Sequence, residues 1–271
     1  MHKHARTALK LLTILFACIG FFFVVGYIAV RAGFTDTLGV IDQQSASFLP
    51  STSEYATFPL AHTPEWVAFR QAVAKDKSMI EAIAKETGAS PRTLIAILVP
   101  EQMRLFHSNR PLFKKIFGPL KILGSQSQFS WGIFGIKDET ARAVEAHLQD
   151  PSSPFYLGVK FEHALDFTTN EPDQERFSRI VAERDHTYAY RYAGLYVAQI
   201  ATQWKNAGFP INKKPEIIAT LWNLGFEKSK PHSTPMSGGA TIDINGAPWS
   251  FGALAHAFYY SDEMVELFPA E

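Results

Sequence analysis

The N-terminal run of apolar residues constrains this chain more than any other part of its sequence. From Leu11 to Val30 there is no charged residue, and a helix of about 20 residues rises about 30 Å, which matches the hydrocarbon core of a bilayer. Basic residues precede the run, at Lys3, Arg6 and Lys10. Because basic flanks stay on the cytoplasmic side, we predict a cytoplasmic tail at residues 1–10, one transmembrane anchor at residues 11–30 and export of the remainder.

A cleaved signal peptide is the alternative to a retained anchor. The segment LFAC, which ends at Cys18, resembles a lipoprotein cleavage site, but Phe16 fits that site poorly and the apolar run continues beyond it. We therefore favour the anchor. Cys18 is the only cysteine, so the remainder of the chain has no disulfide, no thiol nucleophile and no cysteine-based metal site.

Charge and motifs exclude several classes of function. Lys and Arg together number 26, as do Asp and Glu, and this zero net charge disfavours a nucleic-acid-binding protein. No histidines have the spacing of a zinc protease, and there is no Gly-rich phosphate loop or Gly-x-Ser-x-Gly turn. We expect no metal and no cofactor.

The rest of the sequence predicts a linker followed by one mainly α-helical domain. Residues 31–61 are rich in Gly, Ser, Thr and Pro without a sustained period, as in a linker. In the domain, residues 62–271, Thr63-Pro64 and Ser90-Pro91 are typical of helix starts. After the helix that begins at Pro91, helices are predicted over residues 138–148, 154–167, 172–184, 187–207, 214–222 and 249–260. The glycine-rich segment GGATIDINGAP predicts a short hairpin or an ordered loop.

Glu101 is the candidate catalytic residue. It follows the apolar segment LIAILVP, and Pro100 is expected to kink or end that helix and so to place Glu101 at the helix end. Apolar surroundings favour the protonated carboxyl, which is the form that a general acid for glycosidic-bond cleavage needs. The alternative is an exposed glutamate without a chemical role.

Three ordered segments carry a resemblance to a known family. The segments are LIAILVPEQ, SWGIFGIKDETA and IIATLWNLG, and they lie between about Ser90 and Phe226. They resemble the lysozyme-like lytic transglycosylases of bacterial cell walls, in the superfamily of soluble lytic transglycosylases and goose-type lysozymes. That family has an apolar helix ending in Glu, then Ser-x-Gly-apolar-apolar-Gln-apolar before a Thr-Ala helix, then Ala-x-Tyr-Asn-x-Gly. The resemblance implies a lysozyme-like domain behind the anchor.

The resemblance also implies the residues of the site. Glu101 would be the acid, and the substrate-binding residues would be Ser130, Gly132, Ile133, Phe134, Trp222 and Asn223. Gly132 would let the backbone approach a sugar ring closely, and Trp131 and Phe134 would offer apolar faces. The alternative is that this turn only packs onto the core.

The implied reaction uses one glutamate. Glu101 would protonate the oxygen between N-acetylmuramic acid (MurNAc) and N-acetylglucosamine (GlcNAc), and as a base would help the muramyl 6-hydroxyl to form a 1,6-anhydromuramyl end. A hydrolysing muramidase usually pairs two carboxylates. No second one stands out: Asp138 is better explained as a helix N-cap, Glu139 as a first-turn acid and Asp243 as part of the late loop. A glycan lyase is therefore favoured over a hydrolase.

Departures from the family pattern leave a second function open. Gly135 stands in place of the family glutamine, Gln102 in place of a serine, and Trp222 in place of a tyrosine. Residues 104–121 are an unusual basic insertion, which is either a solvated face or a surface for an envelope protein partner. The alternative function is a catalytically weakened lysozyme-like protein that binds peptidoglycan or serves as an envelope scaffold.

These expectations place the protein in a bacterial envelope. It would be a single-pass protein of the inner, cytoplasmic membrane, with its C-terminal domain in the periplasm or at the cell exterior. Its partners would be peptidoglycan glycan strands and, through residues 11–30, the membrane.

Overall fold

A computed structural model describes residues 58–106 and 131–270, together with single positions between residues 10 and 25. The chain divides into two compact units, residues 1–38 and 39–271. Among the described residues, no helix has both the length and the apolar character needed to span a bilayer. Most of the predicted anchor and linker lies outside the described residues.

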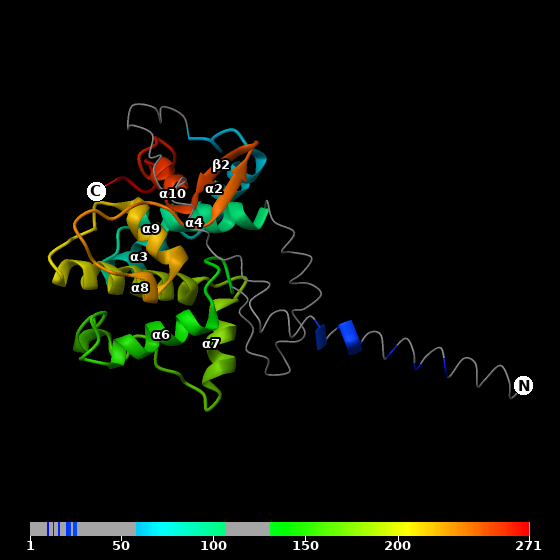
Figure 1. Cartoon of the computed structure of the whole chain (residues 1–271), viewed down its shortest axis with the longest axis vertical. Helices are drawn as coiled ribbons and strands as arrows, with labels where there is room; N and C mark the ends of the chain where they lie inside the picture. Colours follow the sequence, from blue (N-terminus) through cyan, green and yellow to red (C-terminus); the bar gives the residue numbers. More distant parts are fainter. Residues whose placement is uncertain are drawn as a thin grey trace, which may run out of the picture. The chain divides into compact units, whose positions relative to one another are not determined.

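The second unit is mainly helical, with one small antiparallel hairpin (Figure 1). Strand β1 (Thr241–Ile244) pairs with β2 (Ala247–Ser250). The helices are α2 (Pro64–Lys75), α3 (Lys77–Thr87), α4 (Pro91–Phe106), α6 (Asp138–Gln149), α7 (Pro172–Ile180), α8 (Thr187–Asn206), α9 (Pro215–Leu224) and α10 (Phe251–Tyr259), with short 3-10 turns η3 (Val159–Phe161) and η4 (Phe226–Lys228). The predicted α class and the hairpin are confirmed.

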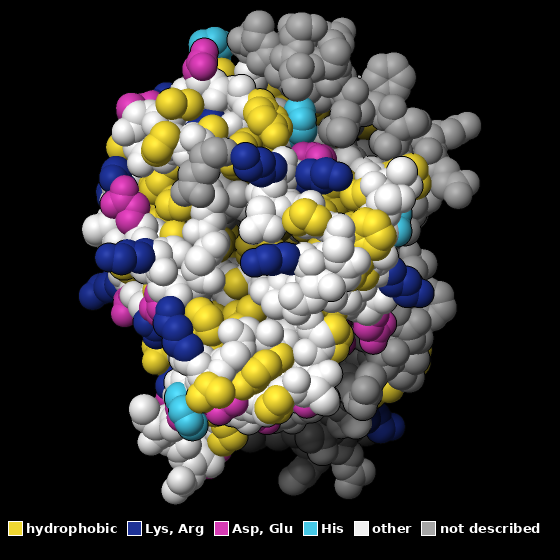
Figure 2. All heavy atoms as spheres, turned by 90° about the vertical axis from the view of Figure 1, so that its left-hand side faces the viewer, with side chains coloured by type: hydrophobic (Ala, Val, Ile, Leu, Met, Phe, Trp, Pro, Cys, Tyr) yellow, Lys and Arg dark blue, Asp and Glu magenta, His cyan; other side chains and the backbone are white. Residues whose placement is uncertain are grey.

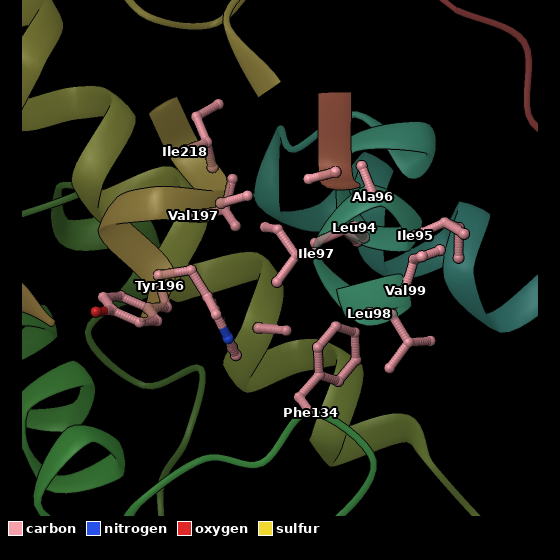
Figure 3. Close-up of a cluster of buried hydrophobic side chains, with 14 of the residues drawn as sticks. Leu94, Ile95, Ala96, Ile97, Leu98, Val99, Phe134, Tyr196, Val197 and Ile218 are labelled. Carbon is pink, nitrogen blue, oxygen red and sulfur yellow. The ribbon is translucent and has the colours of Figure 1, made fainter. Parts of the chain in front are cut away.

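Helix α4 is the centre of the core. Every residue from Leu94 to Val99 is at most 2% exposed, and a helix that is apolar on all sides must be surrounded by other elements. Helices α3, α8, α9 and α10 pack around it, and α8 separates it from α6 (Figure 1). Figure 3 shows the α4 side chains radiating from the helix, in one cluster with Phe134, Val197 and Ile218.

A buried arginine fastens the start of α4 to the end of α10. The guanidinium of Arg92 is fully buried, and it donates five hydrogen bonds of 2.7–3.1 Å to backbone carbonyls, those of Phe258, Tyr259, Ser261, Glu263 and Phe268. Carbonyls at a helix C-terminus lack intrahelical partners and carry partial negative charge. Arg92 satisfies them and thereby fixes the C-terminal segment against α4.

Helix starts follow their local sequence signals. The Thr63 hydroxyl accepts a hydrogen bond of 3.2 Å from the Trp66 amide at the start of α2. Ser250 caps α10 in the same way, accepting from the Ala253 amide at 3.1 Å.

Phe58 and Leu60, which lie in the segment predicted as a linker, are buried in the core.

The predictions at Pro100 and at residues 154–167 differ from the structure. Helix α4 does not end at Pro100 but continues to Phe106, because packing on all sides of α4 outweighs the loss of one backbone donor. Glu101 therefore lies within the helix and not at its end. Residues 154–167 form turns and the short η3 instead of a helix, and Gly158, at φ 97°, leaves the helical region there.

The surface carries charges of both signs. Figure 2 shows one face on which basic and acidic side chains are interspersed with hydrophobic ones. This mixture agrees with the equal numbers of basic and acidic residues in the sequence.

We predict that Arg92→Met lowers the free energy of unfolding by about 3–5 kcal/mol, because it leaves a set of buried carbonyls without a donor. Urea denaturation followed by circular dichroism measures the change. The control is Arg70→Met: Arg70 forms exposed ion pairs with Glu263 and Glu266, and its loss should cost at most about 1 kcal/mol. Equal losses for the two variants would contradict the structural role of Arg92.

Candidate active site

The Glu101 carboxylate is buried between a cation and an indole. Glu101 is only 3% exposed. Its Oε2 accepts a hydrogen bond of 2.7 Å from Nη2 of Arg104, one turn further along α4, and its Oε1 accepts one of 3.3 Å from Nε1 of Trp222 on α9. Glu101 is therefore not an exposed glutamate.

An aromatic cluster holds the Trp222 indole in this orientation. Trp222 is buried, with its ring centroid 4.9 Å from that of Tyr196 and 5.6 Å from that of Phe134. Phe134 in turn lies 5.2 Å from Tyr190 in an edge-to-face contact. Residues from the second and third sequence segments thus fix the donor that reaches Glu101.

The glycine turn before α6 is a tight, closed loop. The backbones of Trp131 and Ile136 exchange two hydrogen bonds, of 2.7 and 3.0 Å. Gly132 and Gly135 both have positive φ, 64° and 59°, a conformation that favours glycine. The turn is also tied to α4, because the side-chain amide of Gln102 donates to the Ile133 carbonyl. Gln102 is one of the departures from the family pattern.

Gly132 is required by packing against α7. A Cβ atom at Gly132 would lie 2.1 Å from the carbonyl oxygen of Ile180, the last residue of α7. Helix α7 is itself fixed by Arg176, whose Nε and Nη2 bind the two carboxylate oxygens of Glu145 at 2.6 and 2.7 Å. The close approach expected at Gly132 is therefore to the protein's own backbone and not to a sugar ring.

Trp131 and Phe134 do not offer the apolar faces expected of them. Phe134 is fully buried and Trp131 is nearly so, with Trp131 packed edge-to-face on Phe177 at 5.1 Å. Their side chains belong to the core, as in the alternative interpretation of the turn. Phe134 acts on the site only indirectly, as support for Trp222. Ile133 stays partly exposed.

Asn223 shapes the loop that leads into the hairpin. Its Oδ1 accepts a hydrogen bond of 2.8 Å from the Ala240 amide, and a Cβ atom at Gly239 would lie 3.0 Å from that oxygen. Among the described residues, no hydrogen bond of the Asn223 side-chain nitrogen occurs. Ser130 lies outside the described residues.

Asp138 and Asp243, which were set aside as a second catalytic carboxylate, form other contacts. The N-cap prediction for Asp138 is wrong, because Lys137 occupies that position. Asp138 is the first residue of α6 and binds the Arg142 Nε at 2.8 Å. Asp243 accepts from the Gly246 amide in the hairpin turn at 3.0 Å. Within the described residues, no group of three His, Cys, Asp or Glu side chains is arranged to hold a metal ion.

The sequence missed Arg104 as a member of the site. Its position in the basic insertion of residues 104–121 allows a solvated face as one interpretation, but its side chain turns inward onto Glu101 and is 17% exposed. The signal available was its spacing from Glu101, since residues three apart on a helix share a face.

In comparisons with known proteins, no protein-family model matches the chain, and no curated protein or solved structure is significantly similar to it.

We predict that Gly132→Ala lowers the free energy of unfolding by at least about 2 kcal/mol, because it combines a clash at Ile180 with a strained backbone. The control is Gly208→Ala, which shares the positive φ, 85°, but has no atom within 4 Å of the added Cβ. Strain alone should cost that variant about 1 kcal/mol. Urea denaturation compares the two, and an equal cost would show that the contact with Ile180 contributes nothing.

Proposed function

We propose that this protein is a peptidoglycan lytic transglycosylase. It would cleave the glycosidic bond between MurNAc and GlcNAc and leave a 1,6-anhydromuramyl end, with Glu101 as the single general acid and base. The observation that carries this proposal is the buried contact of 3.3 Å between Glu101 and the Trp222 indole.

The arrangement of the three sequence segments supports the proposal. The first supplies Glu101, the second supplies Phe134 as packing for Trp222, and the third supplies Trp222 itself. Gln102 joins the first segment to the second through the Ile133 carbonyl. Segments that are far apart in the sequence thus converge on one carboxyl group, which is the arrangement that a lysozyme-like domain needs.

The reaction requires two proton transfers, both at Glu101. Protonated Glu101 gives its proton to the glycosidic oxygen as the bond to the muramyl anomeric carbon breaks, and positive charge develops on the sugar ring. The resulting carboxylate then takes the proton of the 6-hydroxyl as that oxygen attacks the anomeric carbon. Glu101 is restored and no water is consumed. The Trp222 N–H holds Oε1 in place throughout.

The proposal includes the location of the enzyme. Residues 11–30 would anchor it in the inner membrane of a bacterium, with the domain facing the peptidoglycan. Of the basic segment 104–121, a surface for an envelope protein partner in our proposal, only residues 104–106 lie among those described.

A second candidate function is a peptidoglycan-binding or scaffold protein with weakened catalysis. Two observations favour it. Gly135 replaces the family glutamine, and the Glu101 carboxylate is already engaged by Arg104 at 2.7 Å.

The test is mass spectrometry of the fragments that the full chain, in mild detergent, releases from purified peptidoglycan sacculi. We expect anhydromuramyl products from the wild type and a loss of about 100-fold or more in Glu101→Gln, the scale of general acid–base catalysis. Glu216→Gln is the control: burial raises the pKa of Glu216, so it tests whether any half-buried carboxyl group would serve.

The other outcomes are distinct. Reducing-end products would indicate a hydrolase. An unchanged rate in Glu101→Gln would contradict the assignment of the acid. If neither the wild type nor Glu101→Gln releases products but both co-sediment with sacculi, the result would support the peptidoglycan-binding function.

A further inference from the structure

The C-terminal end of α8 presents an exposed aromatic ring. Gly208, at φ 85°, ends the helix, and the Phe209 amide donates a hydrogen bond of 2.9 Å to the Trp204 carbonyl, as in a Schellman motif. Residues 205–210 are all exposed, whereas Ile211 is buried and fixes the loop to the core. The loop therefore holds the ring of Phe209, 36% exposed, at the surface.

A second segment brings two more lysines to the same end of α8. Nε1 of Trp204, in the last turn of α8, donates a hydrogen bond of 2.9 Å to the buried Ser229 hydroxyl. Lys228 and Lys230 flank Ser229 in the sequence and are both exposed. Lys205, the neighbour of Trp204, is exposed as well. The three lysines and the Phe209 loop thus share one end of α8.

This end of α8 is basic. Residues 205–232 contain five lysines and two acids, of which only Glu227 is exposed. Among the described residues, the lysines that form ion pairs are Lys77 and Lys137, and neither lies here. The positive charge is therefore available to a partner. The name α8-end surface is used below for the four residues Lys205, Phe209, Lys228 and Lys230.

We propose that the α8-end surface docks on a bilayer that contains anionic phospholipid. The lysines would bind the headgroup phosphates, and the Phe209 ring would enter the boundary between headgroups and acyl chains. Basic side chains around an exposed aromatic ring are typical of interfacial membrane binding. A soluble anionic polymer needs the lysines but not the apolar ring, so the bilayer is the partner that uses the whole surface.

Docking would also orient the candidate site. Helix α9 carries Trp222 and is followed at once by η4, which carries Lys228. Residues 11–30, as the proposed anchor, would keep a bilayer within reach and so raise its effective concentration. The inference concerns a lipid partner and does not depend on the proposed reaction.

The test is lysine acetylation, measured by mass spectrometry, of the full chain in lipid nanodiscs. The discs contain phosphatidylcholine alone or with about 30% phosphatidylglycerol, which makes their surface negative. We expect the three lysines of the α8-end surface to react at least about threefold more slowly on the anionic discs than on the neutral ones. The difference should disappear at about 0.5 M salt, where surface charges are screened.

Lys75 is the internal reference for this measurement. It is exposed at the end of α2, next to Asp76. Asp76 binds His186, which precedes α8, at 2.7 Å. Helix α8 has 20 residues and so separates its two ends by about 30 Å. Acetylation of Lys75 should be the same on both kinds of disc.

Variants separate the charge from the apolar ring. Lys228→Gln combined with Lys230→Gln should abolish the protection of Lys205, and Phe209→Ser should reduce it. The matched control is Val67→Ser, which removes a side chain that is 50% exposed on α2, and it should leave the protection of Lys205 intact. Circular dichroism checks that each variant is folded.

The contrary outcomes are specific. Equal acetylation on both discs, or protection that survives high salt and the double lysine variant, would overturn the proposal. Protection by peptidoglycan sacculi but not by anionic discs would assign the surface to a wall polymer and contradict a lipid partner. If residues 11–30 do not anchor the chain, the α8-end surface should retain it on anionic discs alone, and its absence from both discs would overturn the docking.

Discussion

The five carbonyls around the Arg92 guanidinium are the constraint on which the rest of the fold depends. The middle of helix α4, from Leu94 to Val99, is apolar on every side, so the helix is stable only when surrounded. The polar groups near its ends then need partners within the protein. At its start, a buried charge is satisfied by carbonyl dipoles at the end of α10 and in the segment that follows it. That contact closes the C-terminal segment over α4 and completes the core that α8, α9 and α10 build around it.

The same helix carries the candidate acid near its other end, where the demands of stability and of chemistry differ. Burial of the Glu101 carboxylate is tolerated because Arg104 and Trp222 both bind it. A general acid must also carry a proton when it protonates the glycosidic oxygen.

Local signals predicted the starts of α2 and α4 and allowed for the hairpin. Contacts between distant parts of the chain determine the features that the sequence did not predict. Thr63 caps α2 as its position before Pro64 suggests. The continuation of α4 through Pro100 depends on packing from four other helices, which no local pattern contains. At the site, the motifs located Glu101 and Trp222, but the role of Gly132 is set by Ile180, a distant residue of α7. From its charge alone, Arg104 is grouped with the basic insertion of residues 104–121. Its contact with Glu101 is visible only in the three-dimensional structure.

The central claim is that a glycan binds where Glu101 and Trp222 meet. The most direct measurement is the indole N–H resonance of Trp222 in the ¹⁵N-labelled full chain carrying Glu101→Gln, which prevents cleavage, during titration with the GlcNAc–MurNAc tetrasaccharide. Trp204, whose Nε1 donates to the buried Ser229 hydroxyl at 2.9 Å, serves as the internal reference. The account predicts that the Trp222 resonance shifts with saturation while that of Trp204 does not. A Trp222 resonance that stays fixed while others respond would contradict it.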